Sequence, residues 1–117
     1  MIDFKELTEL SVTRANRWHD GDFHHWTILE WAGAMCGEAG EAANVAKKLR
    51  RHEQQITGNK GASFEELRDK LGTECADVVL YMILLCAYYD INLENYIVDT
   101  FNEKSIEMGF PERYFRQ

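Results

Sequence analysis

The chain has 117 residues, of which 45% are hydrophobic and 28% charged, and its formal net charge is -7. This length suits one domain, 1–117, with a modest core. The negative charge argues against DNA or RNA as a partner, because nucleic-acid binding normally needs a basic face. The chain has one proline and no sustained alternation of apolar and polar residues, which predicts an all-α fold.

The cysteines and the apolar runs indicate a cytoplasmic protein without a membrane partner. Cys36, Cys75 and Cys86 lie in apolar helical stretches and form no CxxC pair, so we expect reduced thiols inside a core. No signal-peptide pattern opens the chain, and the longest apolar run, 78–89, is too short to cross a bilayer.

The first helix is predicted to begin after Asp3, which has capping-box spacing to Glu6, and to end near Arg17. Its expected buried stripe consists of Phe4, Leu7, Leu10 and Val12.

The segment 18–26 is predicted to be a loop, because residues 20–22 read Asp-Gly-Asp. It also contains His19-Asp20, the dipeptide of the HD phosphohydrolases. Those enzymes need further His and Asp ligands on other helices, and His24 and His25 lie too close in sequence to supply them. We therefore do not favour an HD site.

Three further helices follow from cap signals. A capping box at Thr27 starts a helix to about residue 52, and a polar connection occupies 53–62. Ser63 caps a third helix to about residue 90, and Asn92 caps a fourth that Gly109 closes. We expect a four-helix bundle-like core of helical hairpins, completed by oligomerisation.

Two acidic pairs lie inside these apolar helices, Glu38 with Glu41 and Glu74 with Asp77. Residues three apart share one helix face, so the four carboxylates converge if the two helices are antiparallel neighbours. Four negative charges in one volume repel one another and require a cation. Carboxylates without His or Cys at ligand spacing suit Mg²⁺ or Mn²⁺ better than Zn²⁺. This pattern predicts a metal-dependent enzyme acting on a phosphate ester or phosphoanhydride.

The same residues carry a family resemblance. Glu38-Ala-Gly-Glu41, Glu74-Cys-Ala-Asp77 and Asn102-Glu-Lys104 are similar to the ExxE…ExxD…NxK pattern of the MazG-like all-α nucleoside triphosphate pyrophosphohydrolases, over residues 28–114. The resemblance implies attack of water on the α-phosphorus, giving a nucleoside monophosphate and pyrophosphate. It also implies a homodimer or homotetramer whose base pocket is partly built by a neighbouring subunit.

The resemblance also implies roles for individual residues. Glu38, Glu41, Glu74 and Asp77 would be the Mg²⁺ ligands, with Mn²⁺ as a substitute, while Asn102 and Lys104 would contact the phosphates. Many relatives have a further Glu before the first pair, where this chain has Gly37. The general base is therefore unassigned.

Four more residues are candidate substrate contacts. Trp31 and Lys48 lie on the helix stripe of Glu38 and Glu41, so Trp31 could stack on a base and Lys48 could meet a phosphate. Alternatively, Trp31 is a core residue and Lys48 complements the helix C-terminus. Trp18 and His19 either enter the nucleotide site with their loop, or the loop aromatics cap the core.

Two other classes of protein share features with this sequence. A ferritin-like di-iron centre needs Glu-x-x-His on paired helices, and no His follows a Glu by three residues here. A non-catalytic helical module that binds metal or nucleotide stays open, and Gly37 is its best argument.

Overall fold

The structure, a computed structural model, describes residues 1–116, and this part of the chain is all-helical. The α-helices are α1 (Phe4–Trp18), α2 (Ile28–Glu53), α3 (Phe64–Ala87) and α4 (Leu93–Met108). A short 3-10 helix, η1 (Phe23–His25), lies in the segment that was predicted to be a loop. The predicted all-α class is confirmed.

Each α-helix begins at the predicted cap, whose side chain accepts a backbone N–H of the first turn. The caps are Asp3, Thr27, Ser63 and Asn92. The Glu30 carboxylate in turn accepts the backbone N–H of Thr27 at 3.1 Å, which completes the capping box of α2. Gly109 closes α4 at a φ of 73°, a left-handed conformation that glycine adopts at little cost.

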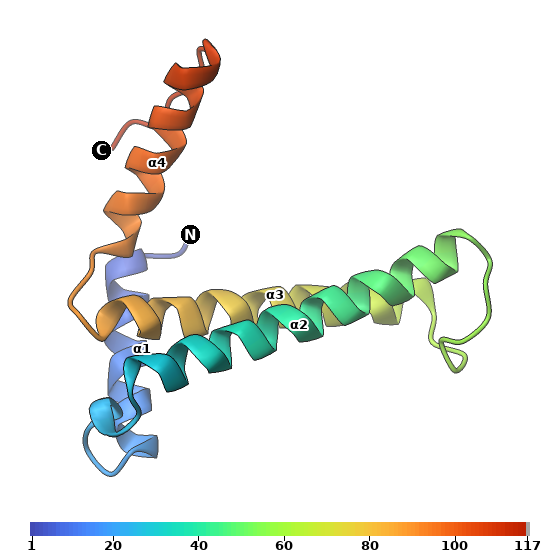
Figure 1. Ribbon diagram of the computed structural model, residues 1–117, viewed down its shortest axis with the longest axis horizontal. Helices are drawn as coiled ribbons and strands as arrows, with labels where there is room; N and C mark the ends of the chain where they lie inside the picture. Colours follow the sequence, from blue (N-terminus) through green and yellow to red (C-terminus); the bar gives the residue numbers. More distant parts are fainter. Residues whose placement is uncertain (117) are drawn as a thin grey trace.

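The α2–α3 hairpin dominates the shape of the molecule (Figure 1). The two helices pack side by side over most of their length, and α1 crosses the C-terminal part of α3. α4 leaves the end of α3 and points away from the hairpin (Figure 1). The radius of gyration is 17.6 Å, against roughly 13 Å for a compact domain of this length. Within the described chain, the four helices therefore do not close into a bundle.

The core lies where α1, η1, the start of α2 and the end of α3 meet. It consists of Ala15, Phe23, Trp31 and Leu84, with further aromatic side chains packed around them. The Trp31 indole N–H donates to the Phe23 carbonyl oxygen at 2.9 Å, so this buried polar group is satisfied. Val45 on α2 and Leu67 on α3 are also buried, much further along the hairpin. The middle of the hairpin thus lies between two apolar regions.

Two expectations about burial were wrong. Leu10 is 59% exposed, because the buried face of α1 is the one that carries Ser11 and Ala15. Cys36 and Cys75 are exposed free thiols, since the outer faces of α2 and α3 are not covered in the described chain.

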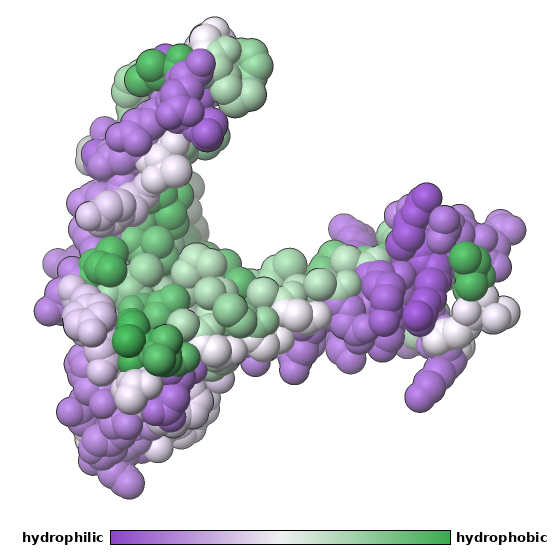
Figure 2. Space-filling view, viewed as in Figure 1, coloured by the Kyte–Doolittle hydropathy of each residue, from purple (hydrophilic) through white to green (hydrophobic). Residues whose placement is uncertain are grey.

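Much apolar surface is exposed (Figure 2). It gathers in the angle between α4 and the hairpin and continues along the hairpin (Figure 2). On α4 the exposed large apolar side chains include Tyr96, Ile97, Phe101 and Ile106. Within residues 1–116 there is no helix with the length and apolar character needed to span a membrane.

Candidate metal centre

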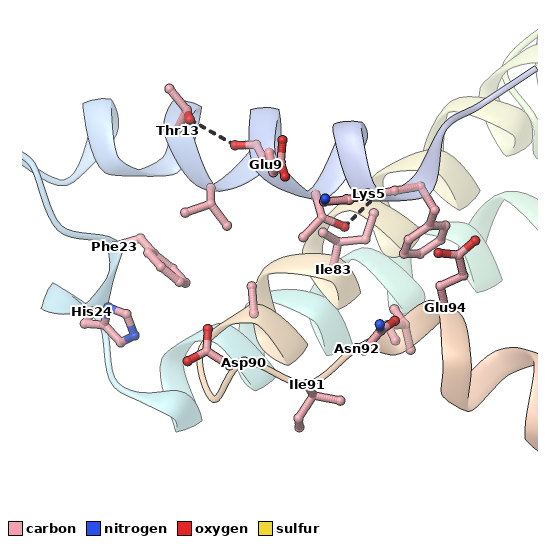
Figure 3. A pocket seen from close by; sticks show the side chains of 15 residues that line it. Lys5, Glu9, Thr13, Phe23, His24, Ile83, Asp90, Ile91, Asn92 and Glu94 are labelled. Carbon is pink, nitrogen blue, oxygen red and sulfur yellow. Dashed lines mark hydrogen bonds between the residues drawn. The ribbon is translucent and has the colours of Figure 1, made fainter.

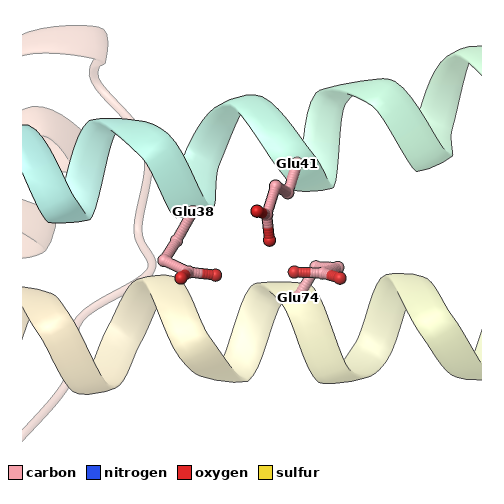
Figure 4. Close-up of side chains that lie close together, drawn as sticks. All are labelled: Glu38, Glu41 and Glu74. Atoms are coloured by element: carbon pink, nitrogen blue, oxygen red, sulfur yellow. The ribbon is translucent and has the colours of Figure 1, made fainter.

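Three glutamates converge in the middle of the hairpin (Figure 4). Glu38 and Glu41 come from α2 and Glu74 from α3, and each offers a carboxylate oxygen within 4.8 Å of the other two. Glu38 and Glu41 point the same way because they are three residues apart on one helix. Glu74 meets them because α3 runs antiparallel beside α2. The convergence predicted from the spacing is present for these three residues.

The electrostatics of the cluster favour a bound cation. Partial burial raises the pKa of Glu38, and the negative charges of Glu41, Asp77 and Glu74 raise it further. Burial likewise raises the pKa of Glu74, together with its interactions with Glu41 and Asp77, while Lys70 acts in the opposite direction. The carboxylates of Glu38, Glu41 and Glu74 are therefore close enough to repel one another when ionised, and a cation between them would offset this repulsion.

One oxygen of the cluster lacks a partner. Glu74 Oε2 is buried and accepts no hydrogen bond from the described residues. A buried acceptor without a donor is costly, so such an oxygen is rare unless it binds something else. Carboxylate oxygens from three residues are a donor set that fits a hard divalent cation such as Mg²⁺ or Mn²⁺.

Asp77 lies next to this group without joining its closest part. Its charge raises the pKa of both Glu38 and Glu74, so its carboxylate lies near both of them. Its oxygens are not among those within 4.8 Å of one another. Three of the four predicted ligands are thus brought together, with the fourth nearby.

Asn102 and Lys104 do not reach the carboxylates in the single chain, because α4 points away from the hairpin (Figure 1). The Asn102 side chain instead binds the C-terminal segment. Its Nδ2 donates to the Tyr114 carbonyl oxygen at 2.9 Å, and its Oδ1 accepts the Tyr114 N–H at 2.7 Å. Lys104 forms an exposed ion pair with Glu107 on its own helix at 3.2 Å.

The other predicted contacts are spread over the molecule. Trp31 is 2% exposed and packs in the core, as the alternative interpretation had it. His19 packs edge-on against Trp26 and Trp31, with ring centroids 5.1 and 5.3 Å away. Trp18 is exposed beside Arg14, and Lys48 is half-buried on α2, two turns beyond Glu41.

A hollow of about 560 Å³ opens beside the glutamates, and the sequence pattern did not predict it. Its walls include Glu41 and Glu74, and also Gly37, Gly40, Asn44, Val45 and Lys70. One sequence signal points to it. Gly37 and Gly40 lie beside Glu38 and Glu41 on the same helix, where glycine leaves space next to the carboxylates.

A second cavity, of about 600 Å³, lies at the other end of α3 (Figure 3). It is bounded by α1, η1 and the connection from α3 to α4, and Asp90 and Asn92 line it with Phe23 and His24. It contains none of the predicted site residues.

The fold and the site together define an all-α protein with a candidate carboxylate metal centre in a helical hairpin. Comparison with known proteins adds no relative: no family model, no curated protein and no solved structure matches the chain.

Proposed function

We propose that the protein is a Mg²⁺-dependent nucleoside triphosphate pyrophosphohydrolase of the MazG-like type, cleaving between the α- and β-phosphates. The observation that supports it most is the group of Glu38, Glu41 and Glu74 around a buried carboxylate oxygen without a partner. The sequence motifs that resemble the family contain these residues.

The chemistry follows from charge. A nucleoside triphosphate carries about four negative charges, and displacement at phosphorus adds charge to the attacking and leaving oxygens. Glu38, Glu41 and Glu74 would hold the ion, with Asp77 completing the ligand set that the resemblance implies. When bound, Mg²⁺ supplies neutralisation of the phosphates and a lower pKa for water. Gly37 has no side chain, so the proposal includes no carboxylate at this position and assigns no residue as general base.

A homodimer or homotetramer is part of the proposal. An extended chain with exposed apolar side chains on α4 and along the hairpin gains stability when a second copy covers them. A second copy could also bring Asn102 and Lys104, which lie on α4, toward the carboxylates. We further propose a cytoplasmic location, since the exposed free thiols Cys36 and Cys75 suit a reducing compartment.

A non-catalytic metal- or nucleotide-binding module is the second candidate, and Gly37 is the observation in its favour. Product analysis separates the two. Common ribo- and deoxyribonucleoside triphosphates are incubated with the protein and either Mg²⁺ or EDTA, and the products are resolved by chromatography. The proposal expects monophosphate and pyrophosphate with Mg²⁺ only. Diphosphate with orthophosphate would overturn the assigned cleavage, and tight nucleotide binding without products would favour the module.

A further inference from the structure

The row of glycines on α2 has no structural explanation within the described chain. Gly33, Gly37 and Gly40 lie on one face of the helix, and a Cβ added at any of them would meet no atom within 4 Å. A glycine in the interior of a helix makes the helix less stable than an alanine at the same position. Packing within the described chain therefore does not require glycine at these positions.

Gly37 and Gly40 form the wall of the hollow beside the glutamates, whereas Gly33 lies outside it. Glu41 and Glu74, two of the three clustered carboxylates, line the same hollow, and the unpartnered Oε2 belongs to Glu74. The hollow of about 560 Å³ is thus continuous with the candidate metal centre. Side chains at positions 37 and 40 would occupy this space.

The remaining polar lining suits an anion. Lys70 and Asn44 both line the hollow, one from each helix. Lys70 forms no ion pair among the residues described, and its positive charge acts on Glu74, four residues along α3. The Lys70 ammonium group and the Asn44 amide N–H can both donate hydrogen bonds to phosphate oxygens.

We propose that this hollow receives the phosphate chain of the substrate, with Lys70 as its cationic contact and Gly37 and Gly40 keeping the space open. This inference rests on the proposed function. It specifies where the polyphosphate binds relative to the carboxylates. It also makes Lys70 a specificity-determining residue, which favours a triphosphate over a monophosphate.

The test measures binding of inorganic tripolyphosphate by calorimetry in the presence of Mg²⁺, which needs no turnover. The variants are Lys70→Gln, Lys70→Arg and Gly40→Leu, and Gly33→Leu is the matched control on the same face. Loss of one charge-assisted contact is expected to weaken binding by about 10-fold or more in Lys70→Gln, with partial recovery in Lys70→Arg. Gly40→Leu is expected to weaken binding by filling the hollow, although it raises helix propensity.

Melting temperature and sedimentation are measured for every variant, so that loss of folding or a change of assembly is not mistaken for loss of the hollow. Unchanged tripolyphosphate affinity in Lys70→Gln and Gly40→Leu, or equal loss in Gly33→Leu, would overturn the inference. So would a wild-type protein that does not bind tripolyphosphate. Binding that depends on Lys70 and Gly40 without hydrolysis of any nucleoside triphosphate would retain the hollow and reject only the proposed function.

Discussion

At the scale of single residues, Glu74 shows how the helical hairpin creates a site. Its buried Oε2 has no partner among the described residues, and its neighbours are the carboxylates of Glu38 and Glu41. Such a group is unfavourable in the metal-free fold, because burial and repulsion both oppose ionisation. A divalent cation would convert the same arrangement into a stabilising one.

Glu74→Gln tests this conversion. We expect Mg²⁺ to raise the free energy of unfolding of the wild-type protein, by about 2.7 kcal/mol at 100 times its Kd, and to have much less effect on the variant. The turnover number is expected to fall by about 100-fold. Thermal unfolding with and without Mg²⁺ measures the first effect. Glu65→Gln, an exposed glutamate on the same helix, is the control and is expected to behave as wild type. Equal stabilisation of Glu74→Gln would place the metal elsewhere.

His24 connects η1 to the end of α3 through both of its ring nitrogens. Its Nδ1 lies 2.9 Å from Asp22 Oδ1 and its Nε2 3.1 Å from the Tyr88 carbonyl oxygen. Both partners are acceptors, so both ring nitrogens need a proton. The hydrogen bond with Asp22, followed by that with Tyr88, raises the pKa of His24 above its ordinary value of 6.5.

A raised pKa contributes stability that is complete below pH 6.5 and is lost as pH rises through the higher value of the folded protein. We expect His24→Gln to destabilise the protein at pH 6 more than at pH 8.5, by a small amount because the side chain is about half exposed. Urea unfolding at the two pH values measures the difference. A difference that is larger at pH 8.5 would contradict this reading of the contact.

At the scale of elements, the sequence signals for helix starts were reliable, whereas the sequence did not show where α4 lies relative to the hairpin. Thr27 and Ser63 start their helices as predicted, because capping is a contact between neighbours in sequence. α3 ends at Ala87 and not near residue 90, since the chain turns there and the Ile91 N–H donates to the Cys86 carbonyl oxygen.

Contacts between distant residues set the rest, and the sequence pattern does not contain them. The pairing of the Asn102 amide with the backbone of Tyr114 is such a contact, and no sequence pattern predicted it. The hollow beside Glu41 and Glu74 requires knowing which glycines remain uncovered once α2 lies on α3. The three-glutamate group was predictable because three-residue spacing and an antiparallel hairpin are both local features.

Asn102→Ala is expected to release the C-terminal segment from α4. Removing the Oδ1 acceptor should speed hydrogen exchange at the Tyr114 amide by about 3- to 10-fold, the equivalent of one ordinary hydrogen bond. Exchange detected by NMR measures it. Asn95→Ala, on the same helix, is the control, because the hydrogen bonds of Asn95 in the described chain are made by its backbone and remain in the variant. Equal exchange rates in the two variants would show that this pair does not hold the segment.

At the scale of the whole molecule, the open shape is the feature that one chain leaves unexplained. α4 carries exposed Ile97 and Phe101, and the molecule extends 47 Å by 45 Å. Exposed apolar side chains on this scale are typical of an interface. The proposed assembly of two or four copies would cover them.

Sedimentation equilibrium tests the assembly. We expect a mass of two or four times 13.6 kDa, and we expect Phe101→Asp to shift the equilibrium toward the monomer, because a charge is costly in an apolar interface. Glu103→Gln on the same helix is the control, since its side chain is already polar and exposed. A wild-type protein that sediments as a stable 13.6 kDa monomer would contradict this part of the proposal.

The most direct test of the central claim follows the oxygen of the attacking water. A nucleoside triphosphate is hydrolysed in ¹⁸O-enriched water with Mg²⁺, by the wild-type protein and by Glu74→Gln, and the products are analysed by mass spectrometry. Attack at the α-phosphorus predicts ¹⁸O in the monophosphate and unlabelled pyrophosphate. The proposed metal centre predicts that Glu74→Gln hydrolyses the substrate much more slowly than the wild-type protein. Label in pyrophosphate or orthophosphate, or full activity of Glu74→Gln, would contradict the account.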